Sequence, residues 1–117
     1  MKSAEGSAVL SKSLQLKGDI SGEEDLFVDG EMEGTIVLEG NRLTIGPNGK
    51  VAAEITVRDL VVFGKLTGDI HATGRVELRQ SAAVLGNVFA SRLSIEESAM
   101  FKGKVELTVE APEAAAE

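Results

Sequence analysis

Residues 60–70, LVVFGKLTGDI, decide the fold, because the two short motifs in this stretch recur along the chain. The first motif, LVV at 60–62, is apolar–any–apolar. The second, LTGDI at 66–70, is apolar–any–small–any–β-branched. This strict alternation has the period of a strand and not of a helix. The intervening Phe63-Gly64-Lys65 contains a glycine, which supplies the backbone freedom of a tight corner.

Both motifs recur with one spacing. The second motif begins at residues 16, 32, 51, 66, 84 and 101, and the first begins at 26, 43, 60, 76 and 93. The five intervals from 16 to 101 average 17 residues, and the spacing of the first motif is 16 or 17 throughout. Two independent series with the same period predict a tandem array of about six strand–turn–strand repeats.

Stacking of the repeats solves a packing problem, because a strand of three to five residues cannot bury its apolar face alone. With one repeat per rung and rungs in register, the inward residues form columns. The columns are Leu26, Leu43, Leu60, Val76 and Leu93; Val28, Ile45, Val62, Leu78 and Ile95; and Ile20, Ile36, Ile55, Ile70, Val88 and Val105. A slip of one residue would turn a column outward, so the register is strongly specified. The sequence predicts an all-β parallel β-helix, a β-solenoid of about six rungs.

A column of small residues runs through the second motif at Gly18, Gly34, Ala53, Gly68, Gly86 and Gly103. We expect these residues to point inward, between bulky neighbours that leave no room for a side chain. A phosphate cradle is the functional alternative. It is disfavoured because a cradle needs one glycine-rich loop leading into a helix, and not one glycine per rung.

The repeat length favours a right-handed coil. Left-handed helices of the acyltransferase type repeat strictly every six residues, whereas the intervals of the second motif range from 15 to 19. An acyltransferase would also need a catalytic histidine in an extended loop, and neither feature is present in the sequence.

Composition excludes several classes of function. The net charge of −7 disfavours binding to nucleic acid, and the absence of cysteine excludes disulfides and thiolate metal sites. No apolar run is long enough to span a bilayer, and residues 1–6 lack the apolar core of a signal peptide. We therefore expect a cytoplasmic protein.

The sequence contains no motif for catalysis. Its one histidine, His71, points outward by register, between Thr56 and Phe89, and one imidazole cannot build a metal site of the carbonic-anhydrase type. Asp19 and Asp69 share a column but lie several rungs apart, too far for a carboxylate pair that cleaves sugars. We expect no enzyme activity, no catalytic residue, no metal and no cofactor.

The ends of the array carry the functional hypothesis. We expect a β-helix over residues 9–109, a short polar tail at 1–8 and a disordered acidic tail at 110–117. Neither tail has the pattern of a cap, so two apolar ends are expected to associate end to end. The expected C-terminal contacts are Phe101, Val105, Leu107, Leu93 and Ile95, and the N-terminal ones are Leu10, Leu14, Leu16 and Ile20. Outward apolar residues that mark lateral contacts are Phe27, Val37, Val61 and Phe89.

The chain resembles the bactofilins over residues 8–108. The resemblance is carried by GDI at 18–20, LFVDG at 26–30, IGPNG at 45–49, LVVFG at 60–64 and AMFKG at 99–103. It implies a right-handed β-helix of triangular cross-section that polymerises through its ends without nucleotide. It also implies a scaffold for cell-wall enzymes and morphology proteins at the inner face of the cytoplasmic membrane. Phe101 matches the C-terminal residue important for polymerisation in the family.

Two points stay open at the level of sequence. Membrane-binding bactofilins carry bulky apolar and basic residues at the N-terminus, and residues 1–8 have almost none, so direct membrane binding is not predicted. The alternative function is a non-polymerising β-helical binding module for a protein or polysaccharide. Sugar-binding faces usually present rows of aromatic residues, whereas the four phenylalanines here are spread over different columns.

Overall fold

The computed structural model describes residues 7–10 and 14–107, with side chains for Val9 and for residues 14–107. The described residues form thirteen strands and no helix, and every strand pair is parallel. The strands are β1 (Ser7–Leu10), β2 (Gln15–Ser21), β3 (Asp25–Val28), β4 (Glu31–Ile45), β5 (Lys50–Val62), β6 (Lys65–Thr67), β7 (Ile70–Ala72), β8 (Arg75–Leu78), β9 (Ala83–Leu85), β10 (Val88–Ala90), β11 (Arg92–Ile95), β12 (Met100–Lys102) and β13 (Val105–Leu107).

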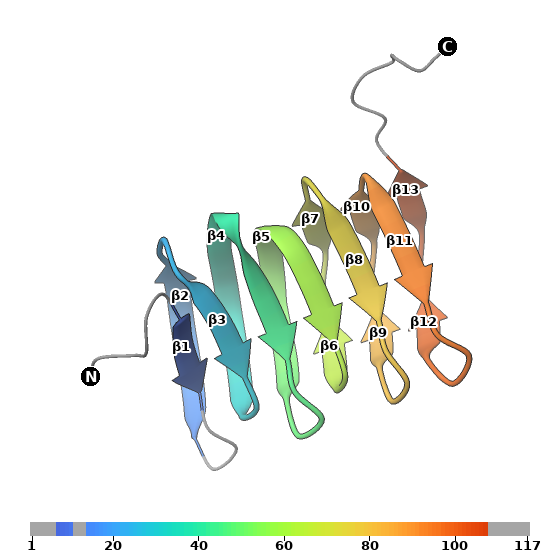
Figure 1. Ribbon diagram of the computed structural model, residues 1–117. Helices are drawn as coiled ribbons and strands as arrows, with labels where there is room; N and C mark the ends of the chain where they lie inside the picture. Colours follow the sequence, from blue (N-terminus) through green and yellow to red (C-terminus); the bar gives the residue numbers. More distant parts are fainter. Residues whose placement is uncertain (1–6, 11–13, 108–117) are drawn as a thin grey trace.

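The chain winds as a right-handed coil with three faces (Figure 1). Face A contains the first parts of β2, β4 and β5, followed by β6, β9 and β12. Face B contains later parts of the same three long strands, followed by β7, β10 and β13. Face C contains β1, β3, the last parts of β4 and β5, then β8 and β11.

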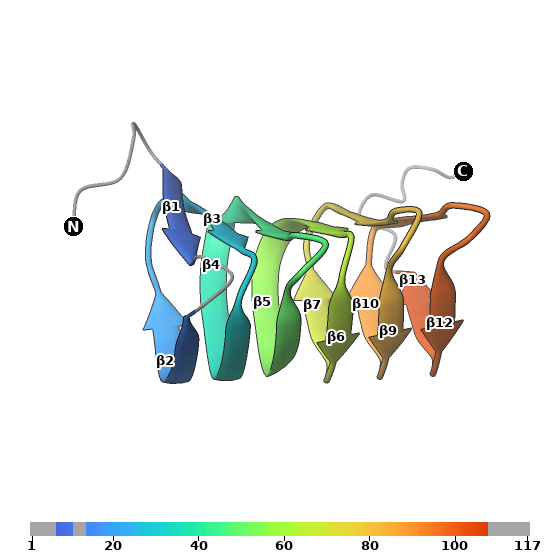
Figure 2. The same ribbon diagram turned by 90° about the horizontal axis from the view of Figure 1, so that it is seen from below.

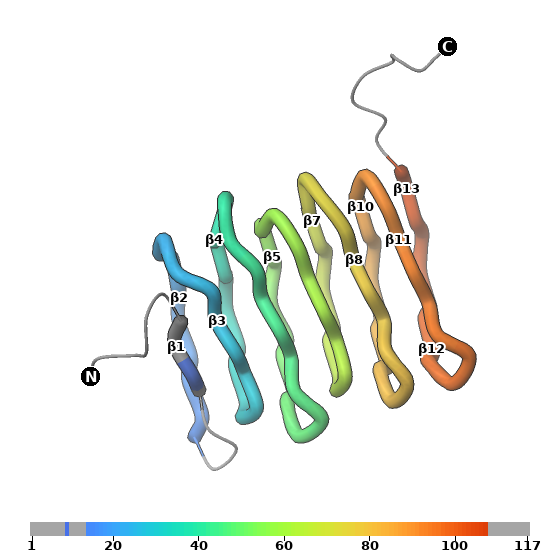
Figure 3. Tube along the Cα trace, in the orientation of Figure 1, coloured from blue at the N-terminus to red at the C-terminus, as the bar shows by residue number. Residues whose placement is uncertain are grey.

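The cross-section is triangular. Figure 2 shows faces A and B meeting at one edge, with face C closing the triangle, and Figure 3 traces the successive turns. The chain crosses each face six times, and it therefore completes about five turns between its first and last crossing of a face. The predicted right-handed, triangular, parallel β-solenoid is confirmed.

The predicted columns form the core in the predicted register. Leu43, Leu60 and Val76 are aligned on successive rungs of face C and are fully buried. On face B, Ile36, Ile55 and Ile70 are likewise aligned and buried. Two further columns complete the interior: Met32, Val51, Leu66 and Val84 on face A, and Leu38, Val57, Ala72 and Ala90 on face B. No polar residue is buried among the residues that the structure describes.

The glycine column has another cause than the one predicted. Gly34, Gly68, Gly86 and Gly103 lie at the edge between faces A and B with φ between +133° and +144°, a region that side chains rarely adopt. A Cβ at Gly34 would point at the backbone of Gly18 in the rung before it, and not into the core. The prediction of an inward small residue was therefore wrong for the glycines, because the strand period does not carry across a corner. It holds for Ala53, which is buried and has no positive φ.

The start of the coil lies within the predicted N-terminal segment. Strand β1 pairs Ser7 with Asp25 and Leu10 with Val28, so the array gains one strand on face C ahead of the first repeat seen in the sequence. The remaining predicted tail residues, 1–6 and 110–117, lie outside the described residues.

Candidate functional site

The C-terminal end of the coil exposes the last member of each core column. Leu107 is 54% exposed, although its neighbour in the preceding rung, Ala90, is fully buried. Ile95 is 48% exposed, whereas Leu78 before it is fully buried. The five residues predicted for this end, Phe101, Val105, Leu107, Leu93 and Ile95, all lie in this terminal rung on β11, β12 and β13. The structure therefore brings these five residues together on one rung, and their role as an interface stays a prediction.

Phe101 is the largest apolar residue of this end. It lies on β12 in register with Val84 of β9, and it packs in part against the buried core. Leu93 packs against the core in the same way. These side chains are anchored on one side by the preceding rung and open on the side where the next rung would lie.

The N-terminal end has the same character. Leu14 and Leu16 on the first crossing of face A are half exposed, whereas Met32, one rung further, is buried. Ile20 is partly buried against the core. Leu10 lies on β1 in register with Val28, and its side chain is outside the described residues. The N-terminal set predicted from the sequence therefore lies on the first rung.

Both ends also present open strand edges. At the C-terminal end, β11, β12 and β13 pair with β8, β9 and β10 on one side only. At the N-terminal end, β2 pairs with β4 alone. Such edges carry rows of unpaired N–H and C=O groups, which favour pairing with another strand. Each end therefore combines an exposed section of the apolar core with backbone groups that can pair with a strand of another molecule.

The exposed large apolar residues of the described chain are concentrated at these ends. Val9, Leu14 and Leu16 lie at the N-terminal end, and Ile95, Met100, Val105 and Leu107 at the C-terminal end. Three residues of this set point outward from a face by register: Val9 beside Phe27 and Met100 beside Ala83 on the terminal rungs, and Leu85 from β9 on face A. Scattered exposed apolar residues are ordinary in proteins, whereas clusters mark interaction sites.

The lateral residues predicted from the sequence are less exposed. Phe27 and Val61 lie on face C, Val37 and Phe89 lie on face B, and all four are half-buried. The ring of Phe89 stacks on the ring of His71, with centroids 4.8 Å apart and planes inclined by 2°. His71 and Phe89 thus stack on each other as neighbours on successive rungs of face B. The two pairs do not come together into one apolar patch.

Polar side chains hold successive rungs together at the corners. The carboxylate of Asp25 accepts a hydrogen bond from the backbone N–H of Arg42 at 2.9 Å, and that of Asp59 accepts one from Arg75 at 3.1 Å. Similar side-chain-to-backbone contacts join Asp29 to Asn48, Asp69 to Asn87, and Asn87 to Lys104. These contacts were not predicted from the sequence, although the recurrence of Asp and Asn at corner positions was a usable signal.

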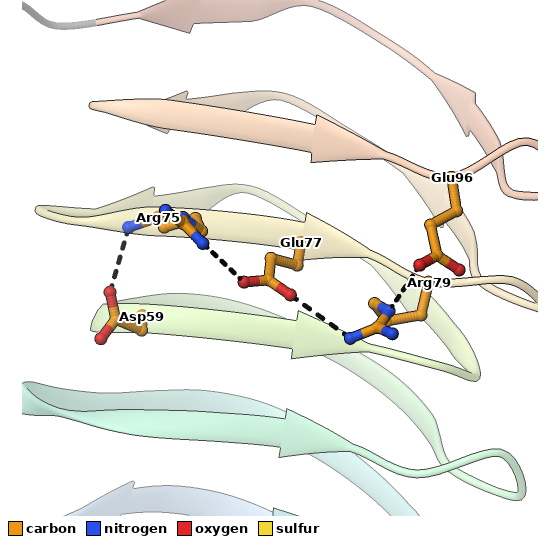
Figure 4. A network of polar contacts seen from close by, with 5 residues as sticks. All are labelled: Asp59, Arg75, Glu77, Arg79 and Glu96. Carbon is orange, nitrogen blue, oxygen red and sulfur yellow. Dashed lines mark hydrogen bonds and ion pairs between the residues drawn. The ribbon is translucent and has the colours of Figure 1, made fainter.

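A series of ion pairs runs across face C (Figure 4). Arg75 pairs with Glu77 at 3.2 Å, Glu77 pairs with Arg79 at 3.5 Å, and Arg79 pairs with Glu96 at 2.9 Å. The Arg79 guanidinium also lies over the ring of Phe63, 5.6 Å from its centroid. Because these side chains are partly exposed, each pair contributes only about 0–1 kcal/mol to the stability of the fold.

Asp59 lies at the start of this series, where it accepts a hydrogen bond from the Arg75 N–H, and its pKa is lowered. Burial raises the pKa of Asp59, but hydrogen bonds from the Arg75 N–H and the Arg58 guanidinium, with the nearby charges of Arg58 and Arg42, outweigh burial. The net effect holds the pKa below its ordinary value of 3.8. The ionised carboxylate therefore stabilises the fold above about pH 3.8, and this contribution is lost as the pH falls through the lowered pKa.

We expect Asp59→Asn to lower the free energy of unfolding by about 1 kcal/mol at pH 7, because the amide loses the charge while keeping an acceptor oxygen. The difference in the free energy of unfolding between the variant and the parent chain should be smaller at pH 3. Urea unfolding followed by circular dichroism at both pH values measures it. Asp19→Asn is the matched control, because the Asp19 carboxylate has no partner among the described residues. An equal loss at both pH values would contradict the electrostatic origin.

The described residues contain no cluster of three or more His, Cys, Asp or Glu that could hold a metal ion. They also contain no helix long and apolar enough to cross a membrane.

Comparison with known proteins adds to this geometry. A family model described as "Bactofilin: Polymer-forming cytoskeletal" matches residues 8–106. Three curated proteins of Myxococcus xanthus (strain DK1622) are similar. Bactofilin BacO is 36% identical over 99 residues, which cover 85% of this chain and 78% of BacO. Bactofilin BacN is 38% identical over 105 residues, covering 90% of this chain and 92% of BacN. Bactofilin BacP is 35% identical over 99 residues, which cover 41% of BacP.

A solved structure is similar over most of its length. The solid-state NMR structure of the cytoskeletal bactofilin BacA matches with a TM-score of 0.79 and 29% identity. The match covers 89% of this chain and 98% of BacA. The three-faced coil therefore has a counterpart in a cytoskeletal protein.

Proposed function

The chain belongs to the bactofilin family of polymer-forming cytoskeletal proteins, and on that premise we propose that it assembles end to end into filaments without nucleotide. The observation that carries the proposal is the pair of apolar, edge-open ends. Each end exposes apolar core residues together with unpaired strand edges. The end of another copy can bury these residues and pair with these strands. Contacts of this kind continue in one direction unless geometry closes them into a ring.

The proposed partners follow from this role. The first partner is a second copy of the same chain, bound through the terminal rungs. The sides of the filament, faces A, B and C, are then left for cell-wall or morphology proteins, so that the filament acts as a scaffold and not as an enzyme. We place this scaffold in the cytoplasm, at the inner face of the membrane where cell-wall synthesis is organised.

We expect the purified chain to form filaments in buffer without nucleotide or metal, visible by negative-stain electron microscopy at micromolar concentration. Filament formation should be insensitive to added ATP, GTP or a chelator, because the ends join by apolar burial and strand pairing. Dispersed monomers at every concentration and salt tested would contradict the proposal. That result would favour the alternative, a β-helical module that binds a protein or polysaccharide on one of its faces.

A further inference from the structure

Face C carries a positively charged groove in an acidic protein. The groove is lined by Arg42, Arg75, Arg79 and Arg92, with Asp59 and Glu77 as its acidic members. Four cationic and two anionic side chains give the groove a net charge of about +2, whereas the whole chain carries −7. Val61 and Phe63 supply apolar surface in the same groove. Its chemistry suits an acidic peptide with small apolar residues.

Two of these arginines are available for a ligand. Arg75 and Arg79 are engaged by Glu77 and Glu96, whereas the guanidinium groups of Arg42 and Arg92 form no ion pair with any described residue, although the charge of Arg42 acts on Asp59 beyond ion-pair distance. Both lie at the corner between faces B and C, just ahead of the inward residues Leu43 and Leu93. These two guanidinium groups thus flank the groove along one edge of the coil.

The chain leaves the coil at this same corner. Strand β13 ends at Leu107, which is in register with Ala90, and Ala90 is followed directly by Ser91 and Arg92. The segment that continues from Leu107, residues 108–117, reads TVEAPEAAAE. It has three glutamates, no basic residue and several small apolar residues. An acidic segment therefore starts beside the arginine that ends the groove.

The segment is long enough to follow the groove. Arg92 and Arg42 are three rungs apart, which is about 14 Å at a strand spacing of about 4.8 Å. Ten residues can extend over at most about 33 Å. Because the segment is tethered, its effective concentration is in the millimolar range, so that a weak contact is enough for occupancy. Exposed ion pairs of this kind are screened by salt with a Debye length of about 8–10 Å.

We propose that residues 108–117 dock in the arginine groove on face C of their own subunit. The glutamates meet the guanidinium groups of Arg42 and Arg92, and the alanines lie on Val61 and Phe63. The docked segment runs along the side of the coil, so it leaves the apolar C-terminal rung open and fills the groove against other acidic ligands. This inference does not depend on filament formation.

Photo-crosslinking tests the proposal in the full chain. The sequence contains no cysteine, so Ala115→Cys provides a single site for a benzophenone maleimide, and mass spectrometry locates its crosslinks. We expect crosslinks concentrated on the face C groove and reduced at least about fivefold by Glu110→Gln/Glu113→Gln/Glu117→Gln, the loss that corresponds to about 1 kcal/mol. Arg42→Gln/Arg92→Gln should reduce them equally, and 0.5 M salt should weaken them.

The matched control is Lys50→Gln/Lys65→Gln, which removes the same charge from face A, where these lysines are adjacent in register. It should leave the crosslinks unchanged. Crosslinks spread evenly over the three faces, or lost equally in the lysine control, would overturn the proposal. Mixing isotope-labelled and unlabelled chains separates contacts within a subunit from contacts between subunits. Crosslinks mainly between differently labelled chains would overturn docking on the segment's own subunit.

Discussion

Replacing Phe101 by arginine is expected to abolish filaments while the β-helix stays folded. Burying a phenylalanine side chain contributes about 1.5–3 kcal/mol, and an arginine at the same place would bring a charge into the junction. The loss of about 3 kcal/mol alone raises the critical concentration for assembly roughly 100-fold. Sedimentation and electron microscopy over a range of protein concentrations measure this shift, and circular dichroism reports whether the strands remain.

Leu85→Arg is the matched control for this prediction. Leu85 is 48% exposed, comparable with the residues of the open end, and it receives the same substitution. It lies on β9, with Thr67 and Lys102 beside it on the neighbouring rungs of face A, so it is on a side and not at an end. We expect Leu85→Arg to keep its filaments, with at most a change in their lateral packing.

A second variant guards against local unfolding, since Phe101 packs in part on the core. Leu107→Arg changes a residue that is more than half exposed and has less packing to lose. It too should prevent assembly. Long filaments from both Phe101→Arg and Leu107→Arg would show that the C-terminal rung is not the junction.

The columns of the core could be predicted because two constraints act on the same residues. Side chains on a strand alternate with a period of two, and a rung of about 17 residues places each motif beside its copy on the next rung. Leu43, Leu60 and Val76 satisfy both conditions, so their register follows from spacing alone. The position of the ends follows equally, since the last repeat in the sequence is the last rung in space.

Corners could not be predicted in the same way, because neither constraint holds there. The alternation of strands suggested that Gly34 and Gly86 point inward, but their positive φ directs the missing Cβ along the axis of the coil.

The ion pairs of face C were not predicted for a related reason. Alternation says that Glu77 and Arg79 point outward, but whether their charged ends meet depends on side-chain conformation. The recurrence of Arg42, Arg75 and Arg92 just before inward residues was the one available signal.

The glycine corner leads to the second large effect. Gly86→Ala is expected to lower the free energy of unfolding by about 3–5 kcal/mol, combining backbone strain at positive φ with overpacking. At φ +141° a Cβ on Gly86 would overlap the carbonyl oxygen of Gly68 and lie 2.7 Å from its carbonyl carbon. These are backbone atoms of a paired rung, so they cannot move aside as a flexible side chain would. Urea unfolding followed by circular dichroism measures the change.

Gly40→Ala separates this steric effect from a general effect of glycine. A Cβ on Gly40 would meet nothing within 4 Å, and the residue has no positive φ, so we expect a change within about 0.5 kcal/mol of zero. Gly18→Ala divides the two causes further, because Gly18 shares the positive φ of +134° but has no rung before it to meet. It should lose only the strain, about 1–2 kcal/mol. If Gly86→Ala cost no more than Gly18→Ala, close stacking of rungs would not be the reason that the corner requires glycine.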